Sequence, residues 1–202
     1  MKPATNSAAW VRRLRRFVDP PPEVCELCRA AIAEAHEHLI AVPARRLVCA
    51  CPGCAAAAPQ GYRRIFQFSR KVADFELGDE LWLSFDIPVD LAFFIRDEST
   101  GRGIALYPGP AGLVQAELPL DGWGELAAQY RWLDDLMPET EALLVNRTQG
   151  AREYFRLSTD HCFALAGLMR SEWRGFGGGP EFWNSLENYL TQLSVAADLH
   201  DA

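Results

Sequence analysis

Short apolar runs separated by turn-forming residues fill the middle of the chain and predict an antiparallel sheet. Residues 39–42 and 46–49 flank Pro43-Ala44-Arg45 and predict a hairpin with a short turn. Further strands are expected at 64–68, 91–95, 103–107, 113–118, 142–145 and 153–157. We expect the strand at 91–95 to pair with that at 103–107 across a polar loop, and the strands at 142–145 and 153–157 to form a hairpin. Pro108-Gly109-Pro110 is expected to break the chain.

Apolar residues at helical spacing predict helices at both ends of the chain and one between strands. The first covers residues 7–18, with arginines on its polar side and prolines 20–22 after its end. Another is expected at 123–130. After the last hairpin, one helix runs to about Trp173, and the next begins at Pro180 with the apolar stripe Phe182, Leu186, Leu190 and Leu193. Strands in succession followed by helices indicate an α+β fold.

The composition indicates a folded protein. Of the 202 residues, 49% are hydrophobic and 22 are Phe, Trp or Tyr, which is ample material for a packed core. No apolar stretch reaches ~18 residues, so no transmembrane helix is expected. Residues 1–10 contain no apolar run of signal-peptide length, and we therefore expect a cytoplasmic protein.

The net charge of −7 is unevenly distributed. Residues 1–70 hold 11 Lys or Arg and 5 Asp or Glu, whereas residues 71–202 hold 9 and 22. The acidic body disfavours general binding to nucleic acids or anionic membranes, which carry the same sign of charge. The basic N-terminal third suits an acidic partner, including the acidic body of the protein itself.

Five of the six cysteines lie within thirty residues and predict a metal site. Disulfides are not expected, because the cytoplasm keeps thiols reduced. Cys25-Glu26-Leu27-Cys28 is followed after 22 residues by Cys51-Pro52-Gly53-Cys54. Two residues between cysteines let a tight turn aim both sulfurs at one point, and two such knuckles form a tetrahedral four-sulfur site. We predict that Cys25, Cys28, Cys51 and Cys54 bind one metal ion.

Zinc and a single rubredoxin-type iron share this coordination. Zinc is the preferred interpretation, because no redox partner domain is visible and a metal would supply folding energy to a segment too small for its own core. Four thiolates leave no open position for water, so a catalytic metal is not expected.

Cys49, His36 and His38 lie in the same segment and are further candidate ligands. Cys49 precedes Cys51 by two residues, so on a strand both would face the same side. It replaces Cys51, adds a fifth ligand or packs in the core, and packing is the preferred interpretation. A cluster with histidine ligands would need histidines next to the knuckle cysteines. We expect one histidine to donate a hydrogen bond to a ligand sulfur and the other to be solvated.

No other part of the sequence resembles a complete active site. Asp160, His161 and Cys162 are neighbours on one predicted helix and point in different directions, so Cys162 is expected in the core. The glycine-rich residues 175–179 predict a connector between helices. The arginines that suit an acidic partner or an anion are Arg12, Arg13, Arg15, Arg16, Arg147, Arg152 and Arg174.

The predicted organisation has three parts. Residues 1–22 form a basic amphipathic helix with a proline linker, and residues 23–58 form a four-cysteine module of zinc-ribbon or rubredoxin type. Residues 59–202 form an antiparallel-sheet domain with C-terminal helices.

Several short stretches of the sequence carry a family resemblance: residues 25–28, His36-Glu37-His38-Leu39, 47–51 with Cys54, 87–89, 91–94, 105–108, 141–147, 150–153 and 173–175. Through them, most of the chain resembles an uncharacterised family encoded beside actinobacterial-type, oxygen-tolerant, high-affinity NiFe hydrogenases. It implies an accessory role in assembling, maturing or wiring such a hydrogenase. Arg29 departs from the glycine expected after the first knuckle.

Three functions are therefore expected in order of preference. The first is a non-catalytic zinc protein that contacts a hydrogenase subunit or maturation factor. The second is a rubredoxin-like iron electron carrier or redox assembly factor. The third is a zinc-ribbon nucleic-acid binder that uses the arginines at 12, 13, 15, 16, 45 and 46, and the acidic body weakens it.

Overall fold

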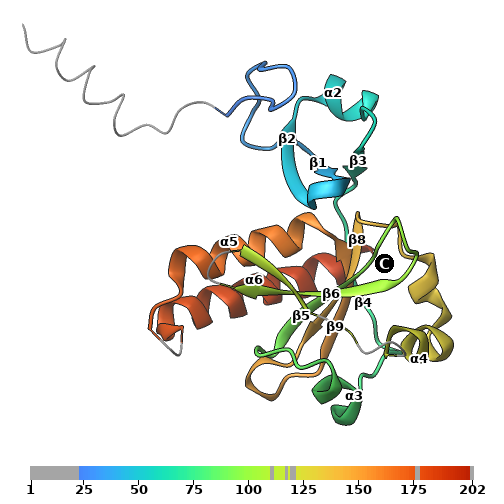
Figure 1. Cartoon of the computed structure of the whole chain (residues 1–202). Helices are drawn as coiled ribbons and strands as arrows, with labels where there is room; N and C mark the ends of the chain where they lie inside the picture. Colours follow the sequence, from blue (N-terminus) through green and yellow to red (C-terminus); the bar gives the residue numbers. More distant parts are fainter. Residues whose placement is uncertain (1–22, 110–111, 117, 119–121, 176–177, 201–202) are drawn as a thin grey trace, which may run out of the picture.

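The computed structural model describes residues 23–109, 112–116, 118, 122–175 and 178–200, the last five as backbone only. It contains a small and a large antiparallel sheet, with the small sheet at one end of the large one (Figure 1). The predicted α+β class is confirmed. The helix predicted over residues 7–18 lies outside the described residues.

Three strands form the small sheet in the order β2-β1-β3: β1 (Glu37–Ala41), β2 (Arg46–Ala50) and β3 (Tyr62–Ile65). β1 and β2 form the predicted hairpin, with the 3-10 helix η1 (Val42–Ala44) and Arg45 in its turn. A short helix, α2 (Pro52–Ala57), follows β2. The strand predicted at 64–68 is shorter than expected, because the chain leaves the small sheet after Ile65 and enters the large one at Ser69.

Six strands form the large sheet in the order β4-β9-β8-β5-β6-β7, with every described pair antiparallel. They are β4 (Ser69–Lys71), β5 (Leu91–Arg96), β6 (Gly103–Gly109), β7 (Gly112–Ala116), β8 (Glu141–Asn146) and β9 (Glu153–Ser158). The predicted pairing of 91–95 with 103–107 and the predicted hairpin of β8 with β9 are confirmed. A 3-10 turn, η3 (Thr148–Gly150), lies in that hairpin.

β6 ends at Gly109, within the expected break at Pro108-Gly109-Pro110, but Pro108 itself still belongs to the strand and pairs with β7. Pro108 lies opposite Leu113, whereas the pairing of β6 with β5 ends at Leu106. One edge of β6 is therefore open at Pro108, and a residue without an N–H fits there.

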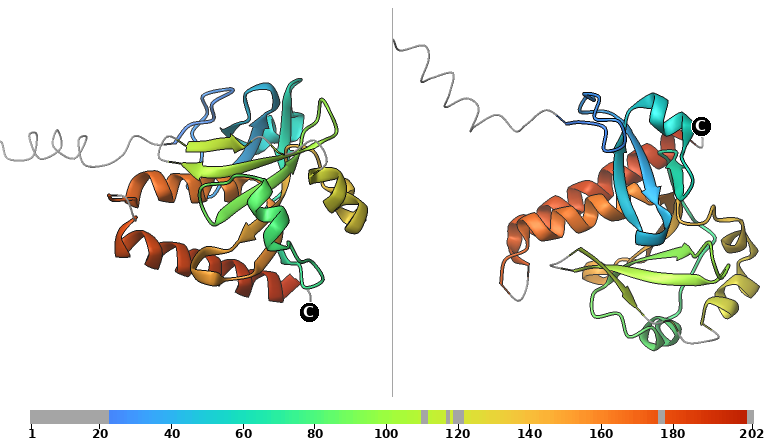
Figure 2. Two further views of the ribbon diagram at one scale, coloured as in Figure 1. Left: turned by 60° about the horizontal axis from the view of Figure 1, so that its bottom comes forward. Right: turned by 45° about the horizontal axis from the view of Figure 1, so that its top comes forward.

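Helices cover both faces of the large sheet. Leu91, Phe93 and Ile95 pack with α5 (Asp160–Glu172) and α6 (Gly179–His200), which lie side by side on one face (Figure 2). Ala92 and Phe94 face the opposite core, which contains residues of α3 (Asp79–Ser84), α4 (Gly122–Gln129) and η2 (Arg131–Asp135). The three helices expected in this region are confirmed, whereas α3 was not predicted. None of the helices in the described ranges is both long and apolar enough to cross a bilayer.

Arg45 joins the small sheet to the large one. It lies in the hairpin turn at φ 43° and forms ion pairs with Asp97, in the β5–β6 loop, and with Glu139, just before β8. Hydrogen bonds from Ser99 and Thr100, together with the charge of Arg45, lower the pKa of Asp97 to about 2. Glu139 is only 2% exposed, and its carboxylate accepts hydrogen bonds from Arg45 and from the Glu98 N–H.

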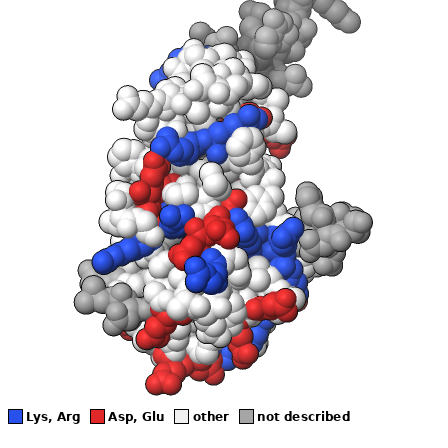
Figure 3. All heavy atoms as spheres, turned by 90° about the vertical axis from the view of Figure 1, so that its right-hand side faces the viewer, with Lys and Arg blue, Asp and Glu red and all other residues white. Residues whose placement is uncertain are grey.

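Other charged groups support the same junction. Arg63 of β3 pairs with Glu98, and the His38 Nδ1 of β1 lies 3.6 Å from the Asp160 carboxylate of α5. Figure 3 shows basic and acidic side chains intermingled across the middle of the face that it presents. Arg45 and Arg63 of the small sheet thus pair with acidic groups of the body.

We predict that Arg45→Met lowers the free energy of unfolding by about 3 kcal/mol, because it leaves the buried Glu139 carboxylate without its cation. Arg63→Met is the matched control, since it removes an arginine from an exposed pair at the same junction and should cost less than about 1 kcal/mol. Denaturant unfolding of the full chain measures both. Equal losses for the two variants would contradict the role given to Arg45.

Candidate metal centre

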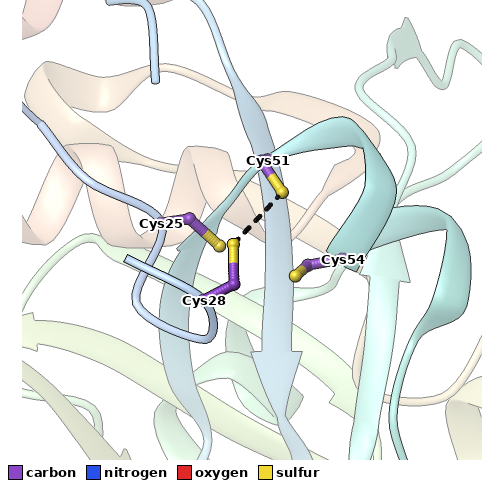
Figure 4. A group of neighbouring side chains, drawn as sticks. All are labelled: Cys25, Cys28, Cys51 and Cys54. Atoms are coloured by element: carbon purple, nitrogen blue, oxygen red, sulfur yellow. Dashed lines mark hydrogen bonds between the residues drawn. The ribbon is translucent and has the colours of Figure 1, made fainter. Parts of the chain in front are cut away.

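Four cysteine sulfurs converge on one point beside the small sheet (Figure 4). The sulfurs of Cys25, Cys28, Cys51 and Cys54 all lie within 4.8 Å of one another, and those of Cys28 and Cys51 are 3.7 Å apart. A tetrahedral ion with metal–sulfur bonds of about 2.3 Å requires sulfur–sulfur separations of about 3.8 Å. The four cysteines therefore lie close enough to hold a metal ion with little movement.

A closed turn presents Cys25 and Cys28. The Cys25 N–H donates to the Ala30 carbonyl, the Arg29 N–H donates to the Cys25 carbonyl, and both bonds are 2.8 Å long. Val24 and Ala31 form a β-bridge that closes the base of the turn. Arg29 has a φ of 65°. It therefore adopts the left-handed conformation for which glycine was expected, and the turn forms despite the side chain.

Glu26 attaches this turn to β2. Its Oε1 accepts a 2.9 Å hydrogen bond from the Cys49 N–H, and its N–H donates to the Cys49 carbonyl at 2.9 Å. Its Oε2 accepts from Arg46 at 2.6 Å. Burial raises the pKa of the Glu26 carboxyl, but the hydrogen bonds from Arg46 and Cys49 outweigh it and hold that pKa below its ordinary value. The first cysteine pair is thus fixed next to the strand that leads to the second.

The start of α2 presents the second pair. Cys51 is extended and precedes the helix, Pro52 occupies a first-turn position, and the Ala55 N–H donates to the Cys51 carbonyl at 2.9 Å. Cys54 lies within the first turn of α2 and points back toward the other sulfurs (Figure 4). This helix was not predicted from the sequence.

The sulfur environments differ in their affinity for protons. Hydrogen bonds from the backbone of Cys51, Cys28 and Leu27 lower the pKa of Cys25 to about 6. Hydrogen bonds shared with the sulfurs of Cys28 and Cys51, together with burial, raise the pKa of Cys54 to about 12. The cluster therefore retains protons at neutral pH, and a bound cation would replace them.

Very little apolar core supports this arrangement. The fully buried hydrophobic cluster of the small sheet consists of Cys25, Leu39, Val48, Ala50 and Ala55. Two of these are alanines and one is a cysteine of the site itself. A core of this size contributes little folding energy, as is typical of small modules that depend on a structural metal.

Cys49, His36 and His38 do not join the four cysteines. Cys49 lies opposite His38 on the paired strands β1 and β2, and its sulfur and one ring nitrogen of each histidine lie within 4.8 Å of one another. The expectation that Cys49 shares the side of Cys51 is wrong, because the strand ends at Ala50 and α2 begins. No hydrogen bond links either histidine to a described sulfur, and His36 is 8% exposed rather than solvated.

Cys162 lies in the core, as predicted, and burial raises the pKa of its thiol well above the ordinary value. Its neighbours point elsewhere: the Asp160 carboxylate faces His38, and the His161 Nδ1 lies 2.7 Å from the Tyr189 hydroxyl. These three residues therefore do not act on one another as nucleophile, base and orienting group.

The candidate partner-binding arginines within the described ranges have partners inside the protein. Arg147 and Arg152 both pair with Asp79, and the buried Arg147 also lies over the Trp82 ring. Arg174 donates to the Trp173 carbonyl instead. Arg12, Arg13, Arg15 and Arg16 lie outside the described residues.

Sequence reasoning missed the body residues that face the small sheet, among them Asp160 and Glu139. Each contacts a residue of the β1–β2 hairpin across a long stretch of chain. The only signal in the sequence was the opposite charge of the two parts of the chain.

Comparison with known proteins places most of the chain in a family. The profile of DUF5947, a family of unknown function, matches residues 24–197. No curated protein and no solved structure matches the chain. The matched residues include all four cysteines of the site and both sheets.

We predict that Arg29→Gly raises the free energy of unfolding by about 1 kcal/mol, because glycine adopts a positive φ without the steric cost that arginine carries. Arg29→Val removes the same charge but adds a β-branched side chain, so it should lower stability. Denaturant unfolding of metal-loaded protein measures both. A glycine variant no more stable than the valine variant would show that this turn is not strained.

Proposed function

Because the chain belongs to the DUF5947 family, which has no assigned function, its role must be inferred from the site, and we propose a non-catalytic metal-binding accessory protein. The main support is that the four cysteine sulfurs lie within 4.8 Å of one another. The proposed ion is Zn²⁺, held by Cys25, Cys28, Cys51 and Cys54. Four thiolates around one ion leave no position for a reacting water, which supports a structural role for the metal.

The proposed role of the metal is to hold the hairpin and its two knuckles in one shape. The small core and the hydrogen bonds of Glu26 place the sulfurs, but they bury little apolar surface. A metal that binds only the folded arrangement stabilises it by its binding free energy. The ordered hairpin then presents Arg45 to the acidic groups of the body.

The proposed partner is a subunit or maturation factor of a NiFe hydrogenase. This step rests on the resemblance of the sequence to proteins encoded beside such enzymes. Two arginines proposed for nucleic-acid binding are already paired within the protein, Arg45 with Asp97 and Glu139 and Arg46 with Glu26. Their internal use favours a protein partner over a nucleic acid.

A rubredoxin-like iron carrier is the second candidate, and the position of Cys28 favours it. Cys28 is exposed, whereas Cys25 is fully buried and accepts hydrogen bonds from the backbone. A metal bound here would lie close to solvent on the Cys28 side, as an electron carrier requires. The oxidised iron form is red and the zinc form is colourless, so colour distinguishes the two candidates.

We predict that Cys25→Ser or Cys54→Ser abolishes retention of the four-sulfur metal and unfolds residues 23–58, because a closed site loses one of its four ligands. Cys162→Ser is the control, since Cys162 lies in the core of the large sheet and should leave the metal in place. Metal analysis and hydrogen exchange of the full chain report the two effects. If all three variants keep or lose the metal alike, the ligand assignment is wrong.

We predict that protein purified from its native host contains zinc and is colourless, and that it co-purifies with a hydrogenase subunit or maturation protein. Elemental analysis, the absorption spectrum and mass spectrometry of the bound proteins measure these outcomes. Red, iron-containing protein would establish the second candidate instead. Recovery of metal-loaded protein with no hydrogenase-related partner would remove the accessory role while leaving the metal site intact.

A further inference from the structure

We propose that His36, His38 and Cys49 form a second metal site, separate from the four cysteines, and that Asp160 of α5 supplies a carboxylate beside it. The thiol sulfur and one nitrogen of each ring lie within 4.8 Å of one another. The His38 Nδ1 is 3.6 Å from the Asp160 Oδ2. The site therefore lies where the small sheet meets α5.

The hairpin itself brings the three ligands together. His38 and Cys49 are directly opposite on β1 and β2, so their side chains leave the same face of the sheet. His36 precedes His38 by two residues, and the two rings meet edge to face with centroids 4.9 Å apart. Ligand atoms of a tetrahedral zinc site with nitrogen and sulfur lie about 3.5 Å apart, so only a small contraction is needed.

His36 is oriented as a metal ligand would be. Its Nδ1 lies 2.9 Å from the Ala33 carbonyl and 3.0 Å from the Glu34 carbonyl, and carbonyl oxygens only accept hydrogen bonds. Nδ1 therefore carries the proton, and in the neutral ring Nε2 keeps its lone pair. That Nε2 has no hydrogen-bond partner, and it is buried because the side chain is only 8% exposed. A buried acceptor without a partner is costly, and a cation would satisfy it.

His38 shows the same lack of a partner. Its Nδ1 is buried and makes no hydrogen bond, and the Asp160 carboxylate lies 3.6 Å away. Asp160 is itself largely buried at the first turn of α5. Histidine ligands of metals commonly have a carboxylate next to them, which orients the ring and raises its basicity. Asp160 is placed to act in this way or to bind the ion directly.

The two sites use opposite faces of one hairpin. Val48 and Ala50 of β2 face the four-cysteine core, and Cys49 between them faces the other way. Neither site shares a ligand with the other. The second site thus goes beyond the proposed function and needs only that the hairpin be folded.

Two imidazoles, one thiolate and a nearby carboxylate suit borderline divalent metals such as Zn²⁺ and Co²⁺. His38 and Cys49 come from β1 and β2, His36 comes from just before β1, and the fourth position is filled by Asp160 or by water. Such a site is less closed than four thiolates, so its ion should exchange faster. A metal here would also link the hairpin to α5.

The test is metal titration of the full chain, made metal-free under reducing conditions, with Co²⁺ and then Zn²⁺. We expect two equivalents in the wild-type protein and one in Cys49→Ala or His36→Gln, in which the Co²⁺ spectrum of a four-thiolate site remains. Asp160→Asn should weaken the second equivalent by about 10- to 100-fold, as is usual when the partner of a metal-bound histidine is removed. His161→Gln is the matched control and should keep both equivalents, because His161 faces Tyr189.

Each other outcome overturns the second site in a recognisable way. One equivalent in wild type and in every variant means that His38 and Asp160 form only an ion pair between β1 and α5. One equivalent in wild type that is lost altogether in Cys49→Ala means that Cys49 belongs to the four-sulfur site. Two equivalents in all four variants place the second ion elsewhere. Failure of the proposed function appears separately, as an absent four-thiolate spectrum in wild type.

Discussion

The convergence of four sulfurs on one point is the constraint on which the N-terminal half of the structure depends. Sulfurs this close cannot all ionise unless a cation sits between them, as the opposite pKa shifts of Cys25 and Cys54 illustrate. The residues that hold them together contribute few buried side chains. An ion would therefore supply much of the energy that keeps the two knuckles and the hairpin in one arrangement.

The β1–β2 hairpin contacts both the cysteine knuckles and the large sheet. One of its faces packs against the knuckles, its other face carries His38 and Cys49, and its turn places Arg45 against the buried Glu139. The residues of the body that pair with the hairpin come from three separate segments: the β5–β6 loop, the residues just before β8 and the start of α5. A change at the cysteines should therefore alter the contacts between the two sheets.

Local patterns in the sequence predicted the features that depend on local chemistry. The spacing of the cysteines, the hairpin around Pro43, the strand pairs and the buried stripe of α6 needed only neighbouring residues. Short-range periodicity carries no information on contacts such as Arg45 with Glu139 or His38 with Asp160, and these were missed. The side of Cys49 was mispredicted for a local reason: the strand was assumed to continue through Cys51, where α2 begins.

Cadmium NMR tests the central claim most directly, because cadmium substitutes for zinc and its chemical shift reports the number of sulfur ligands at each ion separately. The account predicts one resonance in the range of four-sulfur sites for the full chain, unaffected by Cys49→Ala and absent in Cys54→Ser. A spectrum without that resonance, or one in which it survives the loss of Cys54, would contradict the claim that these four cysteines hold one ion.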